Sequence, residues 1–133
     1  MTAKKLKVMI IDDEVNFTRL VRTNLESLGD YEVRAGNRAA DAVPLARVFK
    51  PDFILLDVIM PDGSGGDVAA ALAKLPETSG VPVTFLTAAI KRKELGAPEG
   101  VVGGKNFMAK PVTLNDLSIH IQRRLAEKNL GKN

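Results

Sequence analysis

The sequence predicts an α/β protein with a doubly wound, five-stranded parallel sheet and five helices. Short apolar runs alternate with stretches in which apolar residues recur at helical spacing. This alternation is typical of parallel strands joined by helices that cover both faces of the sheet. The 133 residues, 45% of them hydrophobic, are enough for one apolar core. We therefore expect a single domain over residues 1–133, with its core at about 7–125.

Composition and charge narrow the functions that the protein can have. The absence of cysteine excludes disulfides and thiolate metal sites. The net charge is +3, but the basic residues are scattered and no aromatic residues lie among them, so we expect no direct nucleic-acid binding. The apolar run at residues 8–11 is too short for a signal peptide, and no apolar stretch approaches the length of a membrane span. We expect a cytoplasmic protein that does not contact a membrane.

The first helix is predicted between two strands, at residues 7–11 and 31–35. Both strands are short runs rich in β-forming residues. Apolar residues recur on one helical face through residues 13–28. Gly29 then marks the end of this helix, because glycine accepts the backbone conformation that commonly follows a helix.

The second helix is predicted at residues 38–50, with Asn37 as its amino-terminal cap. Pro44 lies beyond the first turn of this range, so we expect a kink or a delayed start. The third strand follows at residues 52–57 and is apolar up to its last residue. A turn rich in glycine follows at residues 60–66.

The third helix is predicted at residues 68–75, where it ends at Pro76, and the fourth strand at 81–86. The next segment is the least regular part of the sequence. Residues 88–95 favour a fourth helix, whereas the glycines and the proline of residues 96–104 favour a loop. We expect the fourth helix to be short or mobile.

The last predicted strand lies at residues 106–109, and the last helix follows it. Thr113 and Asp116 resemble a capping box at the start of this helix, and its apolar stripe reaches Leu125. The only histidine, His120, lies in this helix, and we expect it at the surface or at an edge, without a functional role.

Polar residues stand at the ends of four predicted strands. They are Asp12, Asp13 and Glu14, then Asp57, Thr87 and Lys110. The carboxyl ends of parallel strands meet at one edge of a sheet, where such proteins form their sites. Carboxylates without histidine or cysteine suit a hard cation, and a hydroxyl beside an ammonium suits phosphate. The set favours Asp57 as a nucleophile that attacks phosphorus, with Thr87 and Lys110 binding the phosphoryl oxygens.

Four segments, IIDDE, LLDVIMPDGSG, VTFLTAA and FMAKP, resemble the receiver domains of two-component response regulators. The similarity runs from about residue 7 to 125, and the four motifs together are specific in their order and spacing. The resemblance implies the flavodoxin-like receiver fold. It also implies Mg²⁺- or Mn²⁺-dependent phosphorylation of Asp57 by a sensor histidine kinase or a His-containing phosphotransfer protein. The implied downstream partner is an effector protein or domain.

The resemblance also implies a metal site, and two residues of this chain bear on the lifetime of the phosphorylated form. Asp13 and Asp57 would bind the cation directly, Asp12 would act mainly through water, and the backbone carbonyl of Ile59 would complete the protein ligands. Ile59 and Ala89 are apolar and cannot orient a water for attack on the acyl phosphate. We therefore expect slow self-dephosphorylation.

Two further family features concern the switch and a peptide bond. Thr87 and Phe107 match the hydroxyl and aromatic switch positions. Movement of Thr87 toward the phosphoryl group would free space for Phe107 and reshape the surface of the fourth helix, fifth strand and fifth helix. Lys110–Pro111 matches the lysine that precedes a cis peptide bond, which only an X–Pro bond adopts at low cost.

Three other functions have to be weighed. A haloacid-dehalogenase-type phosphatase needs a second aspartate two residues after its nucleophile, where this chain has Ile59. A flavodoxin needs a phosphate loop after its first strand, where Asp12 and Asp13 would repel phosphate. A pseudo-receiver that only docks to partners would not need the complete set of site residues. We expect no enzymatic activity beyond the domain's own phosphorylation and dephosphorylation.

Overall fold

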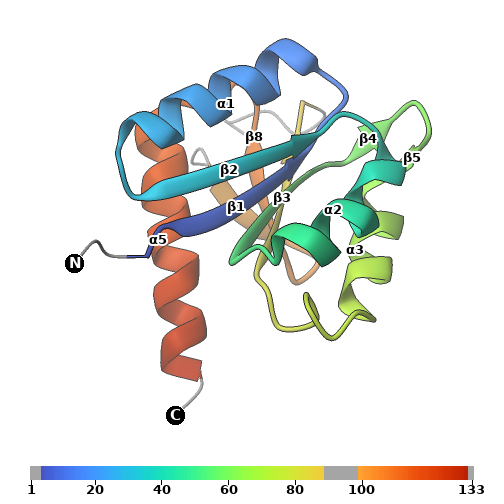
Figure 1. The fold of residues 1–133 in the computed structure, drawn as a ribbon. Helices are drawn as coiled ribbons and strands as arrows, with labels where there is room; N and C mark the ends of the chain where they lie inside the picture. The colour runs from blue at the N-terminus through green and yellow to red at the C-terminus, as the bar shows by residue number, and fades with distance from the viewer. Residues whose placement is uncertain (1–3, 89–98, 132–133) are drawn as a thin grey trace.

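The computed structural model describes residues 4–88 and 99–131, and six strands of these residues form one central sheet (Figure 1). The order across the sheet is β2-β1-β3-β6-β8-β7. The strands are β1 (Leu6–Ile11), β2 (Tyr31–Gly36), β3 (Phe53–Asp57), β6 (Val83–Thr87), β7 (Glu99–Val102) and β8 (Lys105–Ala109). The first five strands in this order are parallel, which confirms the doubly wound α/β class.

Helices cover both faces of the sheet (Figure 1). They are α1 (Val15–Ser27), α2 (Ala42–Phe49), α3 (Gly65–Ala73) and α5 (Leu114–Gly131), with a 3-10 turn at Ala39–Asp41 before α2. One apolar cluster packs α1 and α5 on the sheet, and a second packs α2 and α3 on the opposite face. This double cover explains why the strands are continuous apolar runs, with β3 buried along its whole length.

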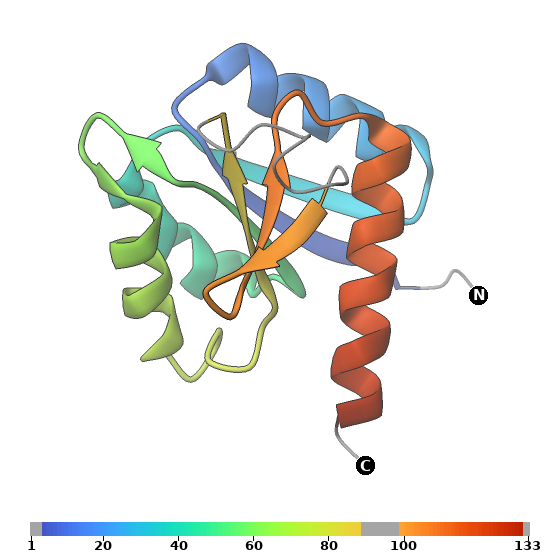
Figure 2. The same ribbon diagram turned by 180° about the vertical axis from the view of Figure 1, so that it is seen from behind.

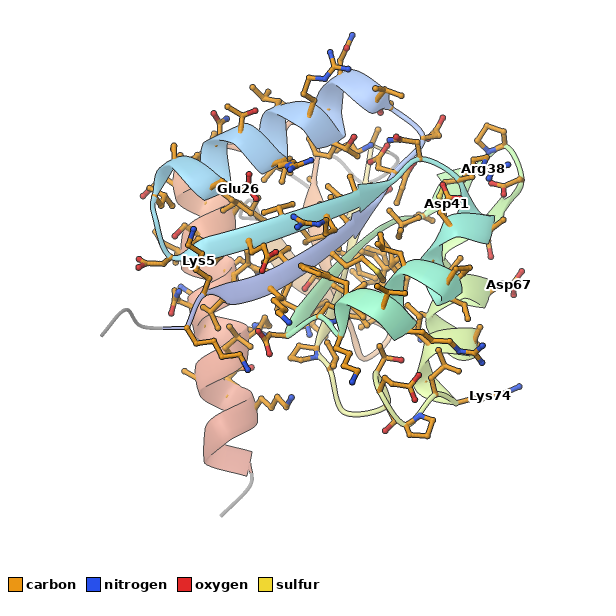
Figure 3. All side chains as sticks on the ribbon, viewed as in Figure 1. Lys5, Glu26, Arg38, Asp41, Asp67 and Lys74 are labelled. Carbon is orange, nitrogen blue, oxygen red and sulfur yellow. The ribbon has the colours of Figure 1, made fainter. Side chains whose placement is uncertain are left out.

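Charged side chains keep to the outer faces of the helices. Figure 3 shows Asp67 of α3 and Lys74, the residue after this helix, pointing away from the sheet. It also shows Arg38 beside Asp41 before α2, where the two form an ion pair of 3.1 Å. None of the described helices is long and apolar enough to span a bilayer.

The edge of the sheet differs from the prediction. Residues 99–102 were expected in a loop, but they form β7, a sixth strand antiparallel to β8 (Figure 2). The turn between the two strands is made by Gly103 and Gly104, with φ of 59° and 78°, and Val101 and Val102 favour a strand before it. The glycines therefore form a hairpin turn. The helix expected at 88–95 lies outside the described residues except for Ala88.

The start of α2 confirms one expectation and corrects another. The helix begins only at Ala42, after the 3-10 turn, so Pro44 falls in its first turn, where the missing N–H has no cost. Asn37 does not cap this helix. Its side-chain amide donates instead to the carbonyl of Asp12 at 2.9 Å and to Thr18 Oγ1 at 3.1 Å, which ties the end of β1 to α1.

The predicted ends of the first and last helices agree with the structure. Gly29 follows α1 with φ of 86°. At the start of α5, Thr113 Oγ1 accepts a hydrogen bond of 3.1 Å from the N–H of Asp116. The chain therefore caps these two helices as their sequences indicate.

His120 was expected at the surface, and this prediction is wrong. The residue is only 1% exposed, with its Nε2 2.6 Å from Thr84 Oγ1 and its ring edge-on to Phe53. Residues three and four apart share a helix face, so His120 lies on the same buried face as Leu117 and Ile121. The hydrogen bond makes a buried polar ring acceptable there.

Candidate functional site

Four parallel strands deliver the predicted site residues to one edge of the sheet. Asp12 and Asp13 follow β1, Asp57 ends β3, Thr87 ends β6, and Lys110 follows β8. All of them but Asp12 line an open cleft of about 190 Å³, and Asp12 is buried beneath it, 2.7 Å from Lys110. The lining residues of the cleft are Asp13, Glu14, Asp57, Val58, Ile59, Thr87, Ala88 and Lys110.

Three carboxylates of the cleft converge closely enough to hold one cation. Ligand oxygens of Asp12, Asp13 and Asp57 all lie within 4.8 Å of one another. Asp12 is fully buried, and Asp57 is 8% exposed. Burial, followed by the charge of Asp12, raises the pKa of Asp57 to about 6, and Lys110 offsets only part of this shift. A divalent cation would relieve the repulsion, and all-oxygen ligands suit Mg²⁺.

Lys110 supplies the positive charge of the cleft. Its Nζ is 2.7 Å from Asp12 Oδ2, 2.9 Å from Glu14 Oε1 and 3.8 Å from Asp57 Oδ1. Burial lowers the pKa of Lys110, but hydrogen bonds to Asp12 and Glu14 outweigh burial, and the pKa lies above its ordinary value. The ammonium therefore stays charged at neutral pH.

Thr87 and Phe107 lie on neighbouring strands. Thr87 is 4% exposed, and its carbonyl accepts a hydrogen bond of 2.9 Å from the N–H of Lys110. Phe107 is half-buried, and its ring lies 5.4 Å from that of Phe85, which pairs with it across β6 and β8. The Lys110–Pro111 peptide bond is cis, as expected.

A small hairpin holds the chain beyond Asp57 in place. Its strands are β4 (Ile59–Met60) and β5 (Gly63–Ser64), and the side chain of Ile59 is 73% exposed beside the cleft. The N–H of Gly65 donates to the carbonyl of Val58 at 2.8 Å. A Cβ at Gly65 would lie 2.3 Å from the carbonyl oxygen of Asp57, so only glycine fits there.

The structure gives two residues a part in the site that the sequence does not assign to them. Gly65 belongs to the turn predicted at residues 60–66, but the glycines at the end of the motif LLDVIMPDGSG also indicate a close backbone approach. Glu14 was quoted within the motif IIDDE, but only the structure brings its carboxylate to Lys110, 96 residues away.

The comparisons with known proteins agree on one family. Residues 8–122 match the response regulator receiver domain. Protein PilH of Pseudomonas aeruginosa is 34% identical over 80% of this chain and 86% of its own length. A response regulator from Desulfuromonas acetoxidans has a similar structure, with a TM-score of 0.73 and 27% identity over 91% of this chain and 97% of its own.

Several curated relatives are longer than this chain, which spans about half their length. One is the alkaline phosphatase synthesis transcriptional regulatory protein PhoP of Bacillus subtilis, which is 29% identical over 94% of this chain and 50% of its own length. Because such relatives are named as transcriptional regulators, the expectation of no nucleic-acid contact has no support. With the family matched over most of its length, the chain belongs to the receiver domains of two-component response regulators, a family of signalling domains and not of conventional enzymes.

Proposed function

We propose that Asp57 accepts a phosphoryl group from the phosphohistidine of a sensor histidine kinase or a phosphotransfer protein. The observation that carries this proposal is the convergence of Asp12, Asp13 and Asp57 beside Lys110, at the carboxyl edge of a parallel sheet. The phosphorylated and unphosphorylated states would then be distinguished by an effector protein or domain.

The transfer is a displacement at phosphorus. A carboxylate oxygen of Asp57 attacks the phosphorus atom, the bond between phosphorus and the histidine nitrogen breaks, and its electron pair leaves with the imidazole. Thr87 donates its hydroxyl hydrogen to one phosphoryl oxygen, and Lys110 pairs with another. Both groups sit in the buried part of the cleft, where such electrostatic contacts are stronger than in water.

The carboxylates fit a bound Mg²⁺ or Mn²⁺ ion. Asp13 and Asp57 would bind it directly, Asp12 through water, and the backbone carbonyl of Ile59 would complete the set. The raised pKa of Asp57 supports this assignment, because burial and then the charge of Asp12 together outweigh the relief that Lys110 gives. When bound, the cation neutralises charge on the transferred group.

The proposed switch couples the cleft to the surface near β8 and α5. Thr87 would move toward the phosphoryl group, and Phe107, whose ring now lies 5.4 Å from that of Phe85, would then fill the space that Thr87 leaves. Phe107 has no hydroxyl, so its two positions would differ in packing alone. Phosphorylation would shift the population between two existing arrangements.

We further infer that residues 1–133 act as one domain in the cytoplasm. One sheet, with the same strands serving both apolar clusters, supports a single folding unit. A phosphorylation-independent pseudo-receiver is the alternative function, and the presence of every phosphate-handling residue in the cleft makes it the weaker one. A phosphatase of the haloacid-dehalogenase type is not favoured, because Ile59 replaces its acid.

Acetyl phosphate and Mg²⁺ provide the test. Intact mass should show one phosphoryl adduct on the wild type, and none on Asp57→Asn or after chelation of the metal. Beryllofluoride, which mimics a bound phosphoryl group, serves where the adduct is short-lived. A wild type that gains no adduct and binds no beryllofluoride would favour the pseudo-receiver instead.

A further inference from the structure

Lys110 lies closer to two other carboxylates than to the phosphoacceptor. Its Nζ contacts Asp12 at 2.7 Å and Glu14 at 2.9 Å, whereas Asp57 Oδ1 is 3.8 Å away. The ring of Phe17 lies 4.8 Å from the same nitrogen. The ammonium is therefore held on the α1 side of the cleft.

Glu14 differs from the other carboxylates around Lys110. It is not one of the three residues whose oxygens converge on a common point. Its side chain is 62% exposed, whereas that of Asp12 is fully buried. Its N–H donates to Asp12 Oδ1 at 3.0 Å, which fixes the residue at the start of α1. Glu14 thus lines the exposed rim of the cleft, and among the described residues its carboxylate pairs with Lys110.

We propose that Glu14 is a positioning residue that holds Lys110 away from Asp57 and slows phosphoryl uptake. The inference rests on the proposed function, in which Lys110 pairs with a phosphoryl oxygen. An ammonium has three N–H donors. One of them is donated to Glu14 Oε1, and the charge of Lys110 also lies at ion-pair distance, 2.7 Å, from Asp12 Oδ2. As Lys110 turns toward the phosphoryl group, the exposed contact with Glu14 is the one that breaks, because exposed ion pairs are the weaker ones.

The test compares rates of phosphorylation by acetyl phosphate at saturating Mg²⁺. Glu14→Gln keeps the length of the side chain and removes its charge, so uptake should be about two- to fivefold faster. The matched control is Glu77→Gln, which removes the same charge from an exposed site in the loop after α3 and should leave the rate unchanged. Equal or slower uptake by Glu14→Gln would overturn the inference.

A second comparison asks whether the effect passes through Lys110. In a Lys110→Met background, Glu14→Gln should give no acceleration, because there is no ammonium left to release. The same acceleration in both backgrounds would mean that Glu14 merely repels the phosphoryl donor, and it would also overturn the inference. Thermal unfolding of each variant verifies that all of them fold.

Glu14→Asp provides the readout if Lys110→Met does not fold. Aspartate keeps the charge but is one methylene shorter, so it should no longer form the ion pair with Lys110. Phosphoryl uptake should then be faster, as it is for Glu14→Gln. A wild-type rate for Glu14→Asp would contradict the positioning role.

If the wild type takes up phosphate at Asp57 but Glu14→Gln is no faster, this inference alone fails. If the wild type takes up none, the proposed function fails and the inference with it.

Discussion

Asp57 is a carboxylate whose surroundings favour its protonated form. Its ordinary pKa is 3.8, and burial with the charge of Asp12 raises it to about 6 in the folded protein. The folded state therefore binds this proton more tightly than the unfolded chain does. The resulting stabilisation is present below pH 4 and is lost as the pH rises through about 6.

The raised pKa of Asp57 predicts how Asp57→Asn changes the stability of the protein in the absence of metal. The variant should be more stable than the wild type by about 1–3 kcal/mol near neutral pH, because it removes a carboxylate that is ionised at a cost. The difference should shrink to roughly half at pH 5. Urea unfolding at both pH values, with a chelator present, measures it. A wild type that is more stable than the variant at neutral pH would contradict the raised pKa.

Ile59 gives a second prediction at the same scale. Its exposed side chain lines the cleft but cannot hydrogen-bond a water. Ile59→Asn supplies a polar group, so the phosphorylated form should decay roughly tenfold faster. The control is Val101→Asn, which makes the same apolar-to-amide change at an exposed position outside the cleft. Decay is followed by intact mass after acetyl phosphate is removed. An unchanged lifetime would show that the apolar side chain of Ile59 is not what slows hydrolysis of the acyl phosphate. Ala89, the other residue invoked, lies outside the described residues.

Among the elements, the join between β3 and α3 depends on one glycine. Gly65→Ala should destabilise the protein by about 1–3 kcal/mol, because the new Cβ meets the Asp57 carbonyl. It should also slow phosphoryl uptake, since the backbone of Asp57 has to shift. Gly66→Ala is the control, because its new Cβ would meet nothing closer than Ser64 Oγ at 3.9 Å and alanine favours a helix. Equal stability of the two variants by urea unfolding would show that the close approach is not tight.

The contact between β6 and α5 gives another prediction at the scale of elements. Thr84→Val keeps the shape of the side chain but removes the hydroxyl that pairs with His120 Nε2. Loss of this buried hydrogen bond should cost about 1–3 kcal/mol in urea unfolding. The same change at Thr23, exposed on α1, should have little effect. A neutral Thr84→Val would show that the hydrogen bond contributes nothing to stability.

The sequence predicted those elements whose signals are local. Apolar runs gave the five parallel strands, Gly29 and Thr113 marked helix ends, and Pro44 delayed the start of α2. Features that depend on partners distant in the chain were not predicted from the sequence. His120 looks like a surface residue until Thr84 is brought against it, 36 residues away in the chain. Asn37 reads as a cap until β1 and α1 offer it better partners.

At the scale of the whole molecule, the candidate site follows from topology. Parallel strands place their carboxyl ends at one edge, so polar residues at four strand ends are enough to predict a cleft. The cleft of Asp12, Asp13, Asp57, Thr87 and Lys110 was therefore predictable as a set. Its distances were not, because side-chain pairing within a cleft is decided by tertiary contacts. The hydrogen bond of 2.9 Å from Lys110 to Glu14 is the clearest example.

The role of Asp57 as the phosphoacceptor is tested best by locating the phosphoryl group in the chain. An acyl phosphate on aspartate is reduced by borohydride to homoserine, which can be located by peptide mass. After incubation with acetyl phosphate and Mg²⁺, we expect homoserine at position 57 and none at Asp12 or Asp13. Homoserine at either of those positions, or none in the chain after an adduct has formed, would contradict the assignment of Asp57 as the phosphoacceptor.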